Sequence, residues 1–198
     1  MKTATIENFE MMDDEQKQIF MEAARHYQAE YIKWREKMDS ISTAVAFHKF
    51  LDETVNKKLG EIPYSCKKGC DFCCRIHNEI TIDEAELLVE YAKDINYTVD
   101  QDLLERQKGK SVQDWRTMPA TDRKCVFLSN GECSVYEHRP ATCRKYYVAS
   151  DPMLCDLDNG ESDNVTVIVD TMAEIVFTGM GAGAPEIGLM ADMLIKKL

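Results

Sequence analysis

The chain has 198 residues and a hydrophobic fraction of 44%, which is typical of one globular domain with a substantial core. Its net charge of −11 argues against binding to nucleic acid, because the phosphates would be repelled. No uncharged apolar stretch has the length of about 18 residues that is needed to span a bilayer. The acidic start of the chain lacks the apolar core of a secretory signal. We therefore expect a cytoplasmic protein without nucleic-acid or membrane partners.

The start of the chain predicts two helices. Apolar residues recur every three or four positions from Asp13 to Met38, and a second pattern of this kind covers Ile41–Leu59, with Ser40 or Ser42 as its cap. The short connection between them predicts an antiparallel hairpin, which we assign to residues 1–60 and expect to pack on the core. We interpret the histidines and methionines of these helices as packing or surface residues.

A third helix is predicted after the first cysteines. Residues 77–82 indicate a short strand or turn, and Thr81 or Asp83 can cap the helix that follows, with Glu84 three residues beyond the threonine as in a capping box. The inner face of this helix would be formed by Ala85, Leu88, Val89 and Ala92. A short further helix is expected over residues 100–107.

Next comes a polar segment, residues 108–124, which predicts an exposed loop that Trp115 attaches to the body. A β-hairpin follows, because Asn130-Gly131 favours the positive-φ turn between the apolar residues 126–128 and residues 133–136. Such a hairpin brings the cysteines on either side of the turn close together.

Past the hairpin, Pro140 suits the first turn of a helix, so Cys143 is expected on a helical turn. The spacing from Val165 to Met180 predicts a helix, although its β-branched residues leave a strand at Val165–Val169 open. The glycines from Gly179 to Gly183 predict a turn between helices, since the context of a phosphate-binding loop is missing, and a last helix should start at Pro185.

Eight cysteines form two blocks and dominate the sequence. They are Cys66, Cys70, Cys73 and Cys74 in the first block and Cys125, Cys133, Cys143 and Cys155 in the second. In a reducing cytosol such clusters indicate metal ligands or redox groups rather than disulfides. Thiolates select zinc, copper(I) or iron–sulfur clusters over magnesium or calcium. We therefore predict a metal-binding core at residues 61–156, with residues 157–198 as a helical segment of the same domain.

The spacing in the first block favours a [4Fe–4S] cluster over Zn²⁺. Cys66-x3-Cys70-x2-Cys73 can place three thiolates around a cluster, whereas structural zinc sites usually use separate C-x2-C pairs. We expect Cys143 as the fourth ligand. Cys74 points away from Cys73 in most backbone conformations, so it would serve a second metal position or act as a neighbouring thiol. The remaining cysteines could bind a second ion or form a redox pair, and neither His77 nor His138 is expected to be a ligand.

Positive residues flank the cysteines in an otherwise acidic chain. Those that we expect to offset the charge of the bound metal centre are Lys67, Arg75, Arg139 and Arg144. Eight thiolates carry eight negative charges, so the centre requires nearby cations or hydrogen-bond donors.

Together these residues resemble the cysteine-cluster family called YkgJ-type or CxxCxxCC, which is described as a zinc- or iron-chelating domain. The resemblance extends from Cys66 to Cys155 and includes the double cysteine and the element Arg139-Pro140-x-x-Cys143-Arg144. The chain departs from the family pattern in its first cysteine spacing and in having Tyr146-Tyr147 without a following proline. Some larger relatives are flagellin lysine methylases, but this chain shows no segment for a methyl-donor domain.

The predicted fold class is mainly α with a small β-hairpin, in a compact single domain organised around a cysteine-ligated metal centre. Three functions remain open. The first is a redox, metal-handling or sensing protein, the second is a metalloenzyme with an open iron site that modifies a protein or small molecule, and the third is a structural zinc module that binds a protein partner. An open coordination position favours the enzyme, and closure by four thiolates favours the structural module.

Overall fold

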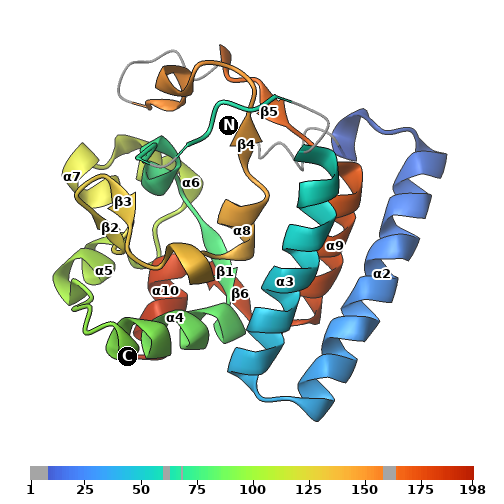
Figure 1. Ribbon diagram of the computed structural model, residues 1–198, viewed down its shortest axis with the longest axis horizontal. Coiled ribbons are helices and arrows are strands. Elements are labelled where there is room, and N and C mark those ends of the chain that lie inside the picture. Colours follow the sequence, from blue (N-terminus) through green and yellow to red (C-terminus); the bar gives the residue numbers. More distant parts are fainter. Residues whose placement is uncertain (1–8, 60–62, 68, 158–163) are drawn as a thin grey trace.

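The computed structural model describes residues 9–59, 63–67, 69–157 and 164–198. It confirms a mainly helical chain with small two-stranded sheets. Figure 1 shows three long helices side by side, with the shorter elements gathered on one side of them. The three are α2 (Asp14–Lys37), α3 (Ser40–Leu59) and α9 (Thr171–Gly183).

Helices α2 and α3 form the predicted hairpin. Asp13 caps α2 in a capping box with Gln16. The expected caps of α3, Ser40 and Ser42, are wrong, because the carboxylate of Asp39 accepts a hydrogen bond from the Ser42 N–H at 2.7 Å. Asp39 therefore supplies the acceptor that satisfies the first turn.

The glycine run in α9 is helical, and the predicted turn at this place is wrong. A Cβ added to Gly179 would lie 2.2 Å from the carbonyl oxygen of Ala24, and one added to Gly183 would lie 2.8 Å from Cβ of Tyr31. Both glycines thus allow the backbones of α9 and α2 to approach closely. The alternative of a strand before α9 is confirmed, since β5 covers Val167–Ile168.

A small sheet joins the middle of the chain to its C-terminal part. Strand β1 (Glu79–Thr81) pairs antiparallel with β6 (Ile187–Leu189), and α4 (Ile82–Asp94) begins directly after β1. The predicted capping box between Thr81 and Glu84 is present. The last helix does not start at Pro185 as expected, because β6 comes first and α10 covers Met190–Ile195.

The segment predicted as an exposed loop also contains helices. After α5 (Gln101–Gln107), which was expected, come α6 (Val112–Thr117) and α7 (Ala120–Arg123). Ser111 caps α6 through a capping box with Asp114. The sequence signal for this helix is therefore limited to a pattern that spans one helical turn. Trp115 is 5% exposed, so its predicted attachment to the body is confirmed.

The second cysteine block is made of short elements. They are β2 (Leu128–Ser129), β3 (Glu132–Cys133), the 3-10 turn η2 (Tyr136–His138), α8 (Ala141–Arg144), β4 (Tyr147–Val148) and the 3-10 turn η3 (Pro152–Cys155). Strands β2 and β3 pair around Asn130 and Gly131, both with positive φ, so the predicted hairpin is confirmed. Strand β4 pairs with β5. The first block contains the 3-10 turn η1 (Phe72–Arg75).

Two apolar clusters form the core. One surrounds α4, α5 and α10 and includes Leu88, Leu103 and Phe127. The other lies between α2, α3 and α9 and includes Tyr31, Phe47 and Met180. Ala141 of α8 belongs to the second cluster, so the short helix that carries Cys143 packs against the long helices. Among the described residues, no helix is long and apolar enough to cross a membrane.

Candidate metal centre

All eight cysteines are free and half-buried. Soft thiol donors fit zinc or iron. In the described part of the chain, however, no three His, Cys, Asp or Glu side chains are placed so that they could hold one ion. The thiols form two groups of near neighbours. Two kinds of evidence indicate these groups: electrostatic repulsion between neighbouring thiols, and the backbone hydrogen bonds that connect the segments that carry them.

The outer thiol group consists of Cys66, Cys70, Cys73 and Cys155. Burial raises the pKa of Cys155 to about 11, and repulsion from the other three thiols adds to this rise. Cys155 reaches them because η3 packs against η1. The position of Cys66 is fixed by a hydrogen bond of the preceding residue, in which the N–H of Ser65 donates to the carbonyl of Val148 at 2.8 Å.

The inner thiol group consists of Cys74, Cys125, Cys133 and Cys143. The N–H of Cys125 donates to the carbonyl of Cys74 at 2.7 Å, and β2 holds Cys133 opposite Leu128. Burial raises the pKa of Cys125 to about 12 and raises that of Cys143 strongly, with repulsion from neighbouring thiols of both groups as a further cause. Cys125 and Cys133 also pack against the first apolar cluster.

The two groups meet at the adjacent cysteines. A hydrogen bond from the Cys74 thiol lowers the pKa of Cys73, and burial and the charge of Asp71 oppose this effect. The same bond is the main cause of a raised pKa at Cys74. Cys73 and Cys74 are therefore joined by a hydrogen bond at the point where the two groups meet.

The four flanking cations lie in different surroundings. The hydrogen bond from Cys74 is the main reason why the pKa of Cys73 is lowered, and the charge of Arg139 contributes, which indicates that Arg139 lies near the thiols. Its guanidinium also lies 4.2 Å from the ring of Tyr136. Arg75 forms an ion pair with Asp71 at 2.8 Å, and Lys67 is exposed. Arg144 is buried and donates to Asp52 and to the carbonyls of Glu137 and Arg139.

Sequence reasoning missed Tyr146 as a neighbour of the outer thiol group. Burial raises the pKa of Tyr146 to about 12, and the nearby charges of Cys155, Cys73 and Cys66 contribute. Tyr146 directly follows Arg144 and Lys145, and this position was the available signal in the sequence. It was considered only as part of a departure from the family pattern, the missing proline after Tyr146-Tyr147.

The histidines next to the cysteines make other contacts. Nε2 of His77 lies 3.1 Å from the carbonyl oxygen of Lys110, and the ring of His138 contacts that of Tyr91. The expectation that these two histidines do not act as ligands stays a prediction.

Trp115 attaches α6 to the first cysteine block. Its indole Nε1–H donates to the carbonyl of Arg75 at 2.9 Å, directly after Cys74. Replacing Trp115 by phenylalanine keeps an aromatic ring but leaves this carbonyl without its donor, which should lower the free energy of unfolding of the metal-free protein by about 1–3 kcal/mol. Denaturant unfolding measures the change, and a loss below about 0.5 kcal/mol would show that water replaces the indole.

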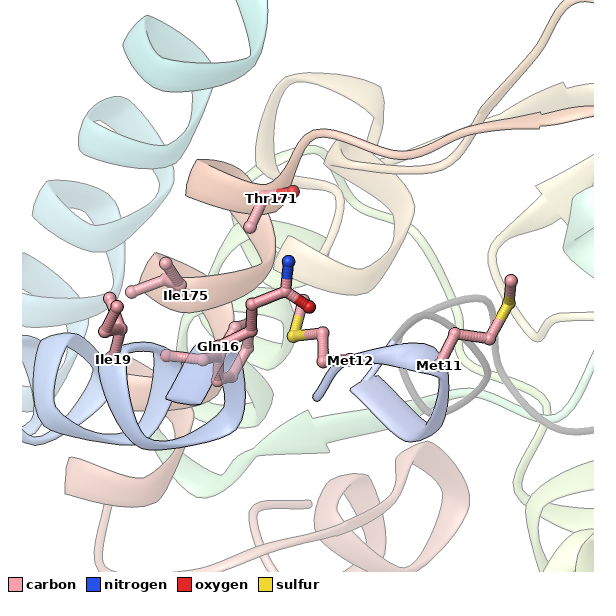
Figure 2. Close-up of a pocket in the computed structure, with 7 residues that line it drawn as sticks. Met11, Met12, Gln16, Ile19, Thr171 and Ile175 are labelled. Atoms are coloured by element: carbon pink, nitrogen blue, oxygen red, sulfur yellow. The ribbon is translucent and has the colours of Figure 1, made fainter. Parts of the chain in front are cut away.

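A shallow pocket of about 390 Å³ lies away from the cysteines, between the start of α2 and the start of α9. Figure 2 shows Met12, Gln16 and Ile175 grouped there, while Met11 stands apart. The lining contains no carboxylate, imidazole or thiol. This pocket therefore adds no acid, base or thiol nucleophile to the centre.

Comparison with known proteins agrees with the cysteine pattern. Residues 65–166 match the family CxxCxxCC, described as a putative zinc- or iron-chelating domain. No curated protein and no solved structure shows significant similarity to the chain. The match covers just over half of the 198 residues and contains all eight cysteines. The chain therefore belongs to the CxxCxxCC family of cysteine-rich chelating domains.

Proposed function

We propose that this protein binds a [4Fe–4S] cluster through the outer thiol group and serves a redox, sensing or metal-handling role. The observation that carries the proposal is the packing of η3, which ends at Cys155, against η1, which contains Cys73. The thiols would close around the cluster when it binds, because no three of the described side chains are placed to hold one ion in the metal-free chain. Three thiols with the spacing x3 and x2 are thereby joined by a fourth from the later block. Four cysteine thiolates are the usual ligand set of such a cluster, which supplies one-electron transfer when bound.

Cys155 replaces Cys143 as our proposed fourth ligand. The sequence favoured Cys143 because arginines flank it, but Arg144 is occupied by Asp52 and two backbone carbonyls. Cys143 is coupled to Cys125 and Cys133 of the inner thiol group as well as to Cys73. The pKa of Cys155, in contrast, is raised by burial and by the charges of Cys66, Cys70 and Cys73 of the outer thiol group.

The inner thiol group supports a second candidate, a structural zinc site. Its thiols lie on the hairpin and on short turns, and two of them pack against the apolar core. Zinc bound by four thiolates needs no redox chemistry and contributes directly to folding. This arrangement would combine a cluster at the outer group with a closed zinc site at the inner group.

Metal analysis of anaerobically purified protein tests both assignments. We expect brown protein that contains iron, acid-labile sulfide and zinc. Cys155→Ser should lose the iron and sulfide and keep the zinc, whereas Cys143→Ser should lose the zinc and keep the cluster. Each variant is the control for the other, because both remove one thiol from the second block.

Three outcomes would contradict the proposal. Colourless protein with zinc alone would exclude the cluster. Loss of iron in Cys143→Ser but not in Cys155→Ser would restore Cys143 as the fourth ligand. Protein that binds neither metal under reducing conditions would exclude both sites.

A further inference from the structure

The carboxylate of Glu84 joins three separate segments of the chain. It lies in the first turn of α4 and is 2% exposed. Its Oε1 is 2.7 Å from the backbone N of Ala141 and 2.8 Å from Nε2 of His48. Its Oε2 accepts from the N–H of Thr81 at 2.8 Å and from the Thr81 hydroxyl at 3.0 Å. Both oxygens are thus fully engaged in the interior.

The contact to Ala141 fixes the turn that carries Cys143. Ala141 is the first residue of α8, and the N–H groups of a first helical turn have no acceptor within the helix. Pro140 has no N–H, so that of Ala141 is the first donor of the turn. Glu84 accepts it, and Cys143 follows two residues later in the same turn.

Helix α3 holds the same turn at two points. His48 contacts Glu84, and Asp52, one helical turn further along α3, pairs with Arg144 at the end of α8. His48 is 3% exposed, and its Nδ1 has no hydrogen-bond partner among the described residues. We assign the tautomer with the proton on Nε2, because this nitrogen then donates to Glu84 while Nδ1 stays an unprotonated acceptor.

Burial alone would raise the pKa of Glu84, but the hydrogen bond with His48 and those from the N–H groups of Ala141 and Thr81 lower it. Glu84 is therefore held as a carboxylate that accepts from all its partners. A neutral side chain of the same shape could not accept all four bonds.

We propose that Glu84 and His48 are positioning residues for Cys143, which they hold toward the inner thiol group by fixing α8 against α3. This inference rests on the proposed binding of metal by that group. It makes the retention of metal depend on the packing of the long helices, through one buried carboxylate that lies between the two cysteine blocks in the sequence.

The test compares Glu84→Met with Asp83→Leu. Asp83 is the neighbouring residue on α4 and is 1% exposed, but it accepts from Tyr31 at 2.7 Å and from Arg35 at 2.9 Å, both on α2. Each variant replaces a buried carboxylate by an apolar side chain of similar size, which cannot accept a hydrogen bond as the oxygen of an amide could. Both should destabilise the fold, and only Glu84→Met removes the acceptor of the Ala141 N–H in α8.

The first measurement is amide hydrogen exchange of residues 141–144 in the metal-free chain. Relative to the global unfolding of each variant, we expect exchange in this turn to rise by about 10-fold or more in Glu84→Met and by less than about 2-fold in Asp83→Leu. The second is the rate at which loaded protein loses zinc to a chelator. Because residues that orient a ligand typically change metal affinity by about 10–100-fold, Glu84→Met should release zinc at least about 10-fold faster, and Asp83→Leu should resemble the wild type.

A second pair of variants covers the case in which Glu84→Met does not fold. His48→Gln keeps an N–H donor near the position of Nε2 and should retain zinc as the wild type does, whereas His48→Leu removes the donor and should release zinc faster. Equal effects of the two variants would overturn the role of His48.

The failures of the two proposals can be told apart. A wild-type chain that binds no metal refutes the metal site by itself. Unchanged exchange at residues 141–144 in Glu84→Met, or equal zinc release in Glu84→Met and Asp83→Leu, refutes the positioning role of Glu84 even if the wild type binds zinc.

Discussion

Replacing Gly179 by alanine is expected to lower the free energy of unfolding by about 3 kcal/mol or more. The added Cβ would lie 2.2 Å from the carbonyl oxygen of Ala24 and 2.8 Å from Cβ of Tyr27. Both atoms belong to or adjoin the backbone of α2, so the two helices have to separate. Overpacking of this kind typically costs about 1–3 kcal/mol, and contact with rigid backbone places the effect at the upper end.

Helix propensity alone predicts the opposite sign, because alanine is favoured over glycine by up to about 1 kcal/mol within a helix. Gly181 provides the matched control in the same helix. A Cβ there would meet only Cδ1 of Ile187 at 3.6 Å, which is ordinary contact. Gly181→Ala should therefore be neutral or stabilising. Thermal and denaturant unfolding measure both variants, and similar stabilities for the two would contradict the close approach of α2 and α9.

Arg144→Lys is expected to destabilise the metal-free protein by about 2–4 kcal/mol. The guanidinium is 4% exposed and donates to Asp52 and to two backbone carbonyls. A lysine ammonium keeps the charge but cannot reach acceptors in three directions from one planar group. At least one of the two carbonyls would lose its charged donor, and hydrogen bonds to charged groups contribute about 1.5–3 kcal/mol each.

This prediction separates two roles for Arg144. If the residue served only to offset the charge of a bound cluster, as its place beside Cys143 suggested, the metal-free protein would be unaffected. Arg139→Lys is the control, because Arg139 covers the exposed ring of Tyr136 and the hydrogen bond that it donates to the Tyr136 carbonyl is exposed. It should change the stability of the metal-free protein by less than about 1 kcal/mol. Urea unfolding in the presence of a chelator provides the comparison.

Patterns within one helix were predictable from the sequence. The spacing of apolar residues indicated α2, α3 and α4, and Asn130-Gly131 indicated the hairpin. The glycines of α9 were misread because their meaning depends on Ala24 and Tyr31, which lie about 150 residues earlier in the chain. A glycine that breaks a helix and one that lets two helices touch look the same in a single sequence.

The site shows the same division between local and distant information. The eight cysteines were evident from their residue type and spacing. Their division into two groups was not, since it depends on how η3 meets η1 and how Cys125 pairs with Cys74. Glu84 was recognised as part of a capping box, but its burial was missed. Its place four residues before Leu88, on the inner face of α4, was the available signal.

The pairing of α2 with α9, and of β1 with β6, has a consequence for how the protein is made. Segments that contact each other are far apart in sequence, so the ribosome releases α2 long before its partner helix exists. Long-range contacts of this kind slow folding and extend the time during which apolar surface is exposed. The match to the cysteine family ends at residue 166, before α9, β6 and α10. A fragment cut at that boundary would lack the segments that cover α2 and β1, so the unit of folding is larger than the unit of sequence similarity.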